Sequence, residues 1–175
     1  METYFIAIKI PEEIEKKIKE KTEGRFNNAF IGKEVAMGNH HLIIKSYGNL
    51  TDDSLEELIE RLSTVEFEGF DLRMGRLDFI QKKFAGNLWI SFKSDRLNQL
   101  VKTIWGTVGW SDNRFKPHVT LYKVKKTLDA PKVKAIANSI RFGGISFKVD
   151  KFALMKSEAL PTGARYSVVE EFSLE

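Results

Sequence analysis

Two histidines stand at the start of two similar strand-like segments. His41 opens the segment HLIIKSY, and His118 opens the segment HVTLYKV. Residues two apart on a strand share a face, so Thr120 points to the same side as His118, and Ile43 to the same side as His41. Imidazoles titrate near neutral pH, and a hydroxyl can hold a phosphoryl oxygen as charge develops. If the two segments face each other, the histidines can carry out general acid–base chemistry on a phosphate ester.

Each motif alone carries little weight, because a lone histidine in an apolar strand is more often a core residue. Metal binding is another use of paired histidines, but two of them make a poor site without a third ligand. No cluster of His, Asp or Glu at ligand spacing accompanies them, so we expect no metal. His40 has the opposite strand parity from His41 and is expected to face away from the cleft, as a structural or surface residue.

An internal repeat places the two histidines at matching positions. Residues 67–80, FEGFDLRMGRLDFI, align without gaps with residues 142–155, FGGISFKVDKFALM, at an offset of 75. Both copies alternate apolar and polar residues with the period of a half-buried strand. The two histidine segments align at an offset of 77. This shared register makes coincidence an unsatisfactory explanation.

Two helix-like segments follow the histidine strands. The first, TDDSLEELIERL, has candidate N-caps from Thr51 to Ser54, and the second, DAPKVKAIANSI, has Asp129 as its N-cap. Strand–helix pairs also precede both histidine strands. Each half therefore reads strand, helix, loop, histidine strand, helix, strand, strand.

This order predicts an α+β fold that forms a single bilobal domain over residues 1–175, with lobe-level repeats at about 1–82 and 86–175. The two lobes would be pseudo-symmetric, each with an antiparallel-type sheet backed by helices, and the active-site cleft would lie between the sheets. A last strand, ARYSVVEEFSL, is expected to complete one sheet.

The composition is that of an ordinary globular protein. Of the 175 residues, 42% are hydrophobic and 30% are charged. The chain has no run of about 18 apolar residues and no basic N-terminal signal, so we expect neither membrane insertion nor secretion. The absence of cysteine excludes disulfides and thiolate metal sites and suits the cytoplasm. The formal net charge of +4 leans only gently towards an anionic partner.

Four segments together resemble the 2H phosphoesterase superfamily, and most closely its RNA 2′,3′-cyclic phosphodiesterase branch, also called the 2′-5′ RNA ligase family. They are YFIAIKIPEEI, NHHLIIKSYGNL, RFKPHVTLYKV and LMKSEALPTGARYSVVEEFSL, and the resemblance covers essentially the whole chain. The second histidine motif, with its Arg-Phe-x-Pro lead-in, is a specific match, whereas the first is degenerate.

The resemblance implies metal-independent attack, without a cofactor, on a 2′,3′-cyclic phosphate at an RNA end. Ring opening leaves a 2′-phosphate, and the reverse-type reaction joins a 5′-hydroxyl in a 2′-5′ linkage. Carried onto this chain, His41 and His118 would be the acid–base pair and Thr120 a phosphate ligand. We take His118 as the base that activates water and His41 as the acid that protonates the ribose O3′, although the sequence alone does not order these roles.

The departure from the family pattern is Ile43, which has no donor at the position of the first threonine. Losing one such donor typically costs about 10²–10³ in rate, so we expect a slowed or retuned enzyme. Arg114, close before the second histidine, is the best candidate to compensate. Phe115 and Tyr47 lie at or beside predicted strand ends and could stack a terminal base, whereas Trp89 reads more strongly as core packing.

Other functions stay open at this point. The chain could act on a small cyclic nucleotide phosphate, or it could be a weakly active or non-catalytic RNA-binding descendant. A purely structural protein would leave the paired histidines unexplained. The expected partner is an RNA end that bears a 2′,3′-cyclic phosphate, with no membrane, and the protein is expected to be a monomer. The long irregular stretch at 21–40 is expected to be mobile and to shape the substrate entrance.

Overall fold

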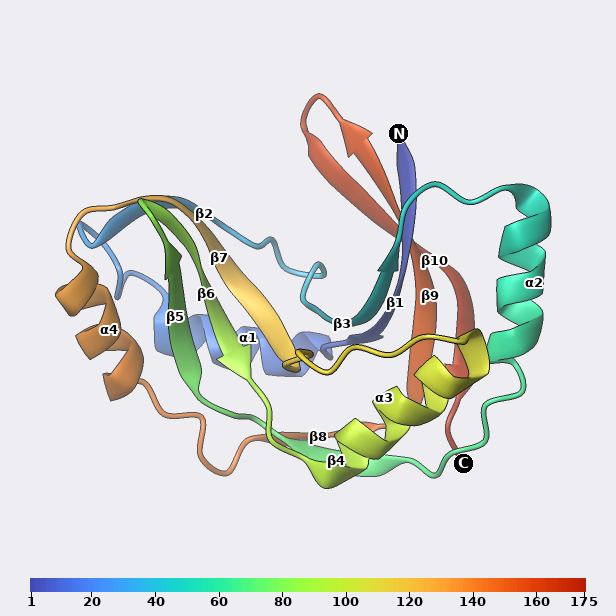
Figure 1. The fold of residues 1–175 in the computed structure, drawn as a ribbon. Coiled ribbons are helices and arrows are strands. Elements are labelled where there is room, and N and C mark those ends of the chain that lie inside the picture. The colour runs from blue at the N-terminus through green and yellow to red at the C-terminus, as the bar shows by residue number, and fades with distance from the viewer.

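The computed structural model describes all 175 residues and contains ten strands and four helices (Figure 1). The first sheet has the order β10-β9-β1-β3, the second sheet has the order β2-β7-β6-β5, and β4 pairs with β8 in a small third sheet. All pairings are antiparallel. The fold is therefore α+β, as predicted.

The strands of the first sheet are β1 (Glu2–Lys9), β3 (His41–Tyr47), β9 (Lys151–Leu160) and β10 (Gly163–Ser173). Those of the second are β2 (Phe30–Glu34), β5 (Leu77–Lys82), β6 (Ala85–Ser91) and β7 (His118–Thr127), and the small sheet has β4 (Phe70–Arg73) and β8 (Ser146–Val149).

The two sequence repeats exchange strands. β9, from the second half, pairs with β1 in the first sheet, and β5, from the first half, pairs with β6 in the second sheet. The expected repeats 1–82 and 86–175 therefore do not map one to one onto the two sheets. The exchange occurs where the chain leaves β4 and β8, at Gly75 and Asp150. Gly75 is required there, because a Cβ atom at this position would lie 1.6 Å from the carbonyl oxygen of Ser91.

The small sheet brings the repeated segments face to face. Leu72 on β4 pairs with Phe147 on β8, and these two residues occupy equivalent positions in the alignment at an offset of 75. When equivalent residues are cross-strand partners, the pair lies on a pseudo-twofold axis. The internal repeat is thus visible in the structure, although each copy pairs with the other copy instead of folding on itself as a hairpin.

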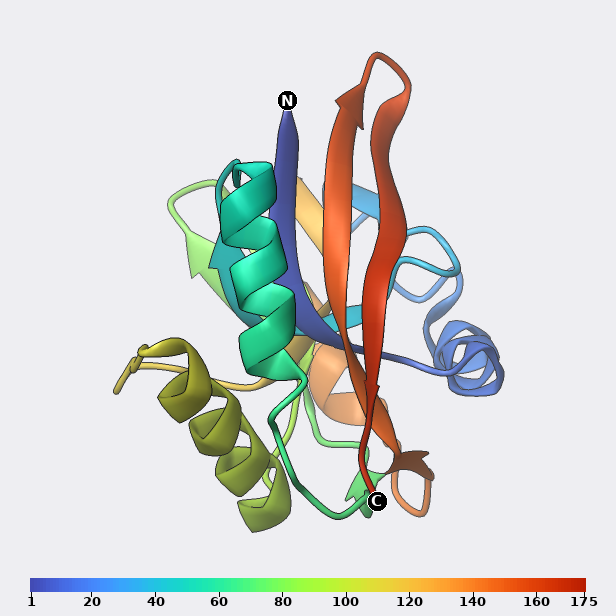
Figure 2. The same ribbon diagram turned by 90° about the vertical axis from the view of Figure 1, so that its right-hand side faces the viewer.

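The four helices lie outside the two large sheets. Their bounds are α1 (Glu12–Thr22), α2 (Asp52–Leu62), α3 (Asp95–Val108) and α4 (Ala130–Ser139). The predicted N-caps are confirmed, because Thr51 and Asp129 accept hydrogen bonds from the backbone N–H groups of Ser54 and Lys132. α2 and α3 pack together, and α2 and α4 lie on the far sides of the two sheets from the gap between them (Figures 1 and 2). None of the helices is long and apolar enough to cross a membrane.

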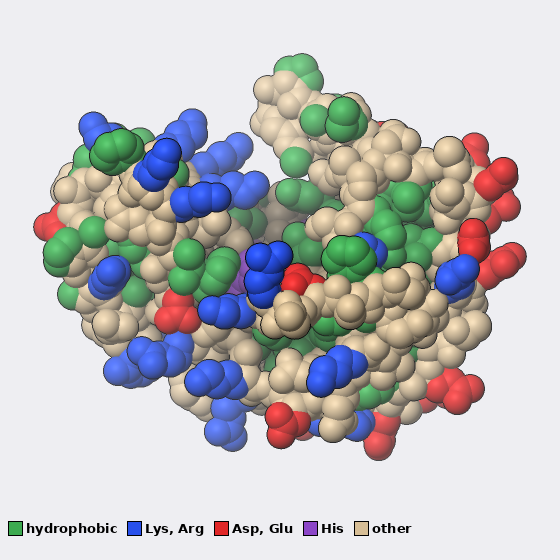
Figure 3. Space-filling view, viewed as in Figure 1, with side chains coloured by type: hydrophobic (Ala, Val, Ile, Leu, Met, Phe, Trp, Pro, Cys, Tyr) green, Lys and Arg blue, Asp and Glu red, His purple; other side chains and the backbone are tan.

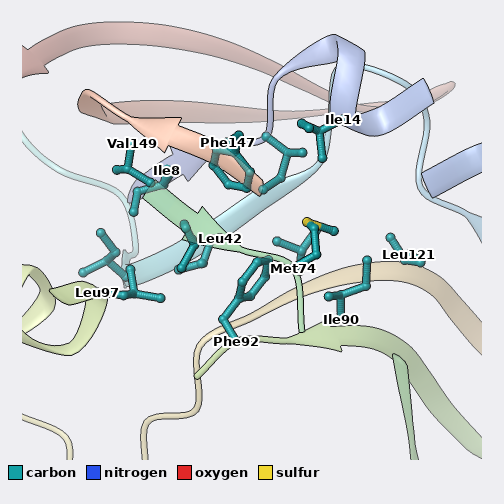
Figure 4. Close-up of a cluster of buried hydrophobic side chains, with 14 of the residues drawn as sticks. Ile8, Ile14, Leu42, Met74, Ile90, Phe92, Leu97, Leu121, Phe147 and Val149 are labelled. Atoms are coloured by element: carbon teal, nitrogen blue, oxygen red, sulfur yellow. The ribbon is translucent and has the colours of Figure 1, made fainter. Parts of the chain in front are cut away.

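One cluster of 38 buried apolar residues connects the two halves of the molecule. Figure 4 shows Ile8 and Leu42 of the first sheet near Met74, which follows β4, Phe92, which follows β6, and Phe147 on β8. A second, small cluster contains Phe5, Ala7, Ala153 and Met155 on the opposite face of the first sheet. The shared interior holds the two sheets in a fixed relation, and this fixes the geometry of the cleft between them.

Candidate active site

The cleft between the two sheets contains a cavity of about 360 Å³ that is lined by both histidines. In Figure 3 the cleft is visible as a hollow between the two lobes. A larger cavity, of about 550 Å³, lies beside α1 but contains neither histidine. The lining of the smaller cavity is formed by Phe5, Lys33, Glu34, Val35, Ala36, Asn39, His41, Ile43, His118, Thr120, Lys123, Thr162, Gly163, Ala164 and Tyr166.

A β-bulge three residues after each histidine gives the two strands the same shape. The pairing of β1 with β3 skips Ile44, and the pairing of β6 with β7 skips Leu121. A bulge bends the strand and changes which face the following side chains occupy. The repeat therefore includes a matching irregularity near each histidine. Before the bulge, each strand presents the histidine and the second residue after it to the cavity.

His118 is held in one tautomer by the backbone. Its Nδ1 lies 2.7 Å from the carbonyl oxygen of Lys116. A carbonyl only accepts hydrogen bonds, so Nδ1 carries the hydrogen and a neutral ring keeps its lone pair on Nε2. The ring lies against Trp89, with centroids 3.9 Å apart. Trp89, expected in the core, is half-buried on the cleft face because it is the cross-strand partner of Thr120.

His41 is more enclosed than His118. Its exposed fraction is 8%, and the rings of Phe5 and Tyr166 meet it edge-on at centroid distances of 5.5 and 5.4 Å. Its Nε2 is buried without a hydrogen-bond partner. Buried polar atoms are nearly always paired, and an unpaired one calls for an explanation such as a catalytic role. Nε2 of His41 is therefore a candidate for a catalytic role.

The pKa of His41 is lowered from 6.5 to about 4. The largest cause is burial, which disfavours the charged ring, followed by electrostatic interactions with Lys9 and His40. A hydrogen bond to the backbone of Asn39 opposes this change. His41 is consequently neutral at pH 7 in the free protein. A negatively charged phosphate next to the ring would raise the pKa again, because an opposite charge favours the protonated form.

Thr120 and Ile43 occupy equivalent places on the two walls. Both line the cavity, and Thr120 is half-buried there with its hydroxyl available. Ile43 has an exposed fraction of 44%, which is high for a large apolar side chain. The site is thus asymmetric, with a hydroxyl on the second sheet and an apolar side chain on the first.

Arg114 and Phe115 do not reach this cavity. Arg114 is exposed in the loop before β7, where its backbone N–H donates to Oδ1 of Asp112 at 2.9 Å. Phe115 packs against Trp105, with ring centroids 5.0 Å apart. The expected compensation for Ile43 by Arg114, and base stacking by Phe115 in this cavity, are therefore not provided by the structure.

Tyr47 also lies outside the cavity, and the bulge explains why. Without it, Tyr47 would share a face with His41 and Ile43 by simple alternation. After the bulge at Ile44, Tyr47 pairs with Tyr4 and packs on the main core. The bulge thus corrects the expected position of this ring.

Two lysines of the cavity lining were missed in the sequence. Lys33 lies on β2, inside the stretch 21–40 that was expected to be irregular, and Lys123 lies after the bulge of β7. Strict alternation from His118 would point Lys123 away from the cleft, so only the bulge reveals it. The loop after β2 lines the cavity as well, through Val35, Ala36 and Asn39. No group of three or more His, Cys, Asp or Glu side chains is placed to hold a metal ion.

Two sheets each present a histidine to one cavity, which fits the resemblance to the 2H phosphoesterases. Residues 92–166 match the model of the LigT like phosphoesterase family. RNA 2′,3′-cyclic phosphodiesterases of Thermotoga maritima and Aquifex aeolicus are each 28% identical to the chain. The first alignment covers 98% of this chain and 95% of the relative, and the second covers 97% and 94%.

The solved structures agree with this match. E. coli LigT in its apo form has a TM-score of 0.77 at 22% identity, over 99% of this chain and 97% of LigT. Its complex with 3′-AMP has a TM-score of 0.74 at 21% identity, over 99% and 98%. The chain is thus similar to LigT-like phosphoesterases over residues 92–166 in sequence and over nearly its whole length in fold, and the resemblance seen in the sequence is confirmed.

Proposed function

We propose that the protein is a cyclic phosphodiesterase that opens the 2′,3′-cyclic phosphate at an RNA end and leaves a 2′-phosphate. The observation that carries this proposal is the buried, unpartnered Nε2 of His41 in a cavity that His118 and Thr120 also line. The names of the two bacterial relatives and the 3′-AMP complex of E. coli LigT support a nucleotide phosphate as the substrate.

The two histidines divide the proton transfers. Nε2 of His118 takes a proton from water, because Nδ1 is occupied by the Lys116 carbonyl. The water oxygen bonds to phosphorus as the bond from phosphorus to O3′ breaks. His41, protonated on Nε2, gives its proton to O3′. One water is consumed, and proton exchange with solvent restores both rings.

The proton on His41 arrives with the substrate. In the free protein its pKa is about 4, so the ring is neutral at pH 7. The phosphate anion of the bound substrate raises this pKa. His41 is therefore protonated, and able to act as the general acid, only when the substrate is in the cavity. Thr120 donates its hydroxyl to a non-bridging oxygen, whereas Ile43 offers no donor on the other side, so the reaction is slowed relative to a site with two hydroxyls.

The proposal also specifies the setting of the reaction. The substrate is an RNA end, no cofactor takes part, and the protein works as a monomer in the cytoplasm. When a 5′-hydroxyl of a second RNA replaces water, the same pair runs the joining reaction that gives a 2′-5′ linkage.

The test uses an RNA oligonucleotide that ends in a 2′,3′-cyclic phosphate, incubated with the protein in EDTA. The expected product is the 2′-phosphate, identified by chromatography against 2′- and 3′-phosphate standards. His41→Gln and His118→Gln should each lower kcat by about 10²–10⁴. Thermal unfolding of each variant shows that it is folded.

Three outcomes would contradict the proposal. RNA that binds but stays uncleaved identifies a binding descendant. Turnover that needs an added divalent cation excludes the two-histidine mechanism. A 3′-phosphate product means that O2′, not O3′, is the leaving group, and the placement of His41 as its acid is then wrong.

A further inference from the structure

Two lysines that the mechanism does not use are neighbours across strands of the second sheet. Lys33 on β2 is the cross-strand partner of Lys123 on β7, and both line the cavity that contains the histidines. Neither ammonium group forms an ion pair with a carboxylate. Like charges directly opposite each other in a sheet are destabilising, so an anion bound between the two ammonium groups would offset their repulsion.

Lys33 reaches the opposite wall of the cleft. Nζ of Lys33 lies 3.6 Å from the position that a Cβ atom would take on Gly163, at the tip of the β9–β10 hairpin. Lys33 therefore spans the cleft from the second sheet to the first. In Figure 3 lysine and arginine side chains gather on the lobe of the second sheet and around the cleft, whereas acidic side chains are frequent on the far flank of the other lobe. An anion that enters here meets positive charge before it reaches the histidines.

The spacing along β7 separates these lysines from the reacting phosphate. Lys123 follows His118 by five residues, and that length of strand spans about 13–16 Å when one residue is bulged. Side chains on a strand stand roughly perpendicular to the sheet. The ammonium group of Lys123 thus lies along the strand from the phosphate that contacts His118, where a second phosphate of the same RNA chain can bind.

A polar side chain continues this row on the other side of β7. Asn87 on β6 is the second cross-strand partner of Lys123, so Lys33, Lys123 and Asn87 form one row across three strands. Asn87 is half-buried, and its amide can donate to a phosphate oxygen. The row lies on the same face of the sheet as Thr120, because the bulge at Leu121 restores Lys123 to that face.

We propose that Lys33 and Lys123 form a second phosphate site, which binds the phosphodiester group that precedes the cyclic end. The enzyme thereby selects the end of a polynucleotide over a cyclic mononucleotide, which has no such group. This inference rests on the proposed function, because it specifies which substrates of the same site are preferred.

The test compares two substrates that differ by this phosphodiester group. One is adenosine 2′,3′-cyclic monophosphate, and the other is the dinucleotide ApA with a 2′,3′-cyclic phosphate end. The variants are Lys33→Gln, Lys123→Gln and the double variant. Lys134→Gln, on the exposed face of α4, is the matched control with the same change of charge.

We expect each cleft variant to lower kcat/KM for the dinucleotide about tenfold or more, mainly through KM, because a charge-assisted contact is lost. The cyclic mononucleotide should change by less than about twofold, because it does not reach the lysines. The dependence of dinucleotide kcat/KM on salt should also become less steep, because a contact between opposite charges is lost. The Lys134 variant should match the wild type with both substrates.

Equal losses with the two substrates would overturn the inference, since the lysines would then act on the reacting phosphate. Equal losses in the Lys134 variant would show a general effect of net charge. If the wild type cleaves neither substrate, the proposed function fails. The second site is then decided by fluorescence anisotropy with labelled ApA 3′-phosphate and labelled adenosine 3′-phosphate. Weaker binding of the dinucleotide alone in the cleft variants supports it, and unchanged binding overturns it.

Discussion

Glu15 on α1 accepts hydrogen bonds from the backbone N–H of Gly38 and from Nδ1 of His40. Both side chains are buried, with exposed fractions of 2% for Glu15 and 6% for His40. The pair fastens the loop between β2 and β3 to α1, and the backbone of Asn39 in this loop hydrogen-bonds to His41. His40 thus faces away from the cavity, as expected, and has a structural role that holds the neighbouring His41 in place.

Removal of this anchor should affect stability and catalysis together. Glu15→Ala leaves a buried imidazole and a backbone N–H without their acceptor, so the free energy of unfolding should fall by about 1–3 kcal/mol per unsatisfied group. Because the loop positions His41, kcat should fall as well, and the pH profile of kcat should shift. Urea unfolding and steady-state kinetics measure these effects.

Glu13→Gln is the control for this experiment, because Glu13 is exposed on the same helix. Its stability should stay within about 0.5 kcal/mol of the wild type. A Glu15→Ala variant with an unchanged kcat and pH profile would limit the pair to a role in folding. In that case the loop does not depend on the anchor for its position at the cavity.

Local features of the fold could be predicted because their causes are local. Thr51 and Asp129 cap helices through bonds to residues three positions later, and this is encoded in a few adjacent letters. The exchange of β5 and β9 between the sheets depends on partners that are far apart in the chain. β2 was missed because it is a short edge strand with mostly exposed side chains, so it lacks the alternation by which strands are recognised.

In the candidate site, too, some positions could be predicted from the sequence and others depend on how the strands pair. His41 and His118 were singled out because the repeat relates them, and Thr120 because it lies two residues after His118 on the same strand face. Trp89 was assigned to the core because it lies between Leu88 and Ile90. In a continuous apolar run, the sequence does not show which side chains face the core and which face the cleft. The positions of Tyr47 and Lys123 depend on two bulges, and no letter of the sequence marks these.

The hydroxyl of Thr120 should act mainly on the transition state. Thr120→Val keeps the shape of the side chain and removes the donor, so kcat should fall by about 10²–10³. KM and the free energy of unfolding should change little, because the side chain is half-exposed and β-branched valine suits a strand. Steady-state kinetics with a cyclic-phosphate RNA check this. A loss confined to KM would place the hydroxyl in ground-state binding instead.

The opposite substitution tests the asymmetry of the site. Ile43→Thr places a donor at the equivalent position on β3, and kcat should rise, by up to about 10²-fold if the new hydroxyl acts as fully as that of Thr120. Ile43 is 44% exposed, so the change should cost little stability. Ile43→Val, which is smaller but has no hydroxyl, is the matched control and should leave kcat unchanged. Unchanged or lower activity in the threonine variant would show that the site is organised around the isoleucine.

The neutral state of His41 makes the stability of the protein depend on pH. Its pKa is about 4 in the folded protein and near 6.5 in the unfolded chain. Between these values the unfolded chain binds a proton that the folded protein does not. The stability associated with neutral His41 is therefore fully present above pH 6.5. As the pH falls towards 4, up to about 3 kcal/mol of it is lost. His41→Gln removes it.

The measurement is the difference in free energy of unfolding between the wild type and His41→Gln, from urea unfolding at several values between pH 7.5 and 4. Carboxylates contribute equally to both proteins, so the difference isolates His41. This difference in free energy of unfolding should become less favourable to the wild type as the pH falls. Inorganic phosphate should weaken this trend, because an anion in the cavity raises the pKa of His41. A difference that is constant with pH would mean that His41 is not held neutral by the fold, and protonation coupled to substrate binding would then be excluded.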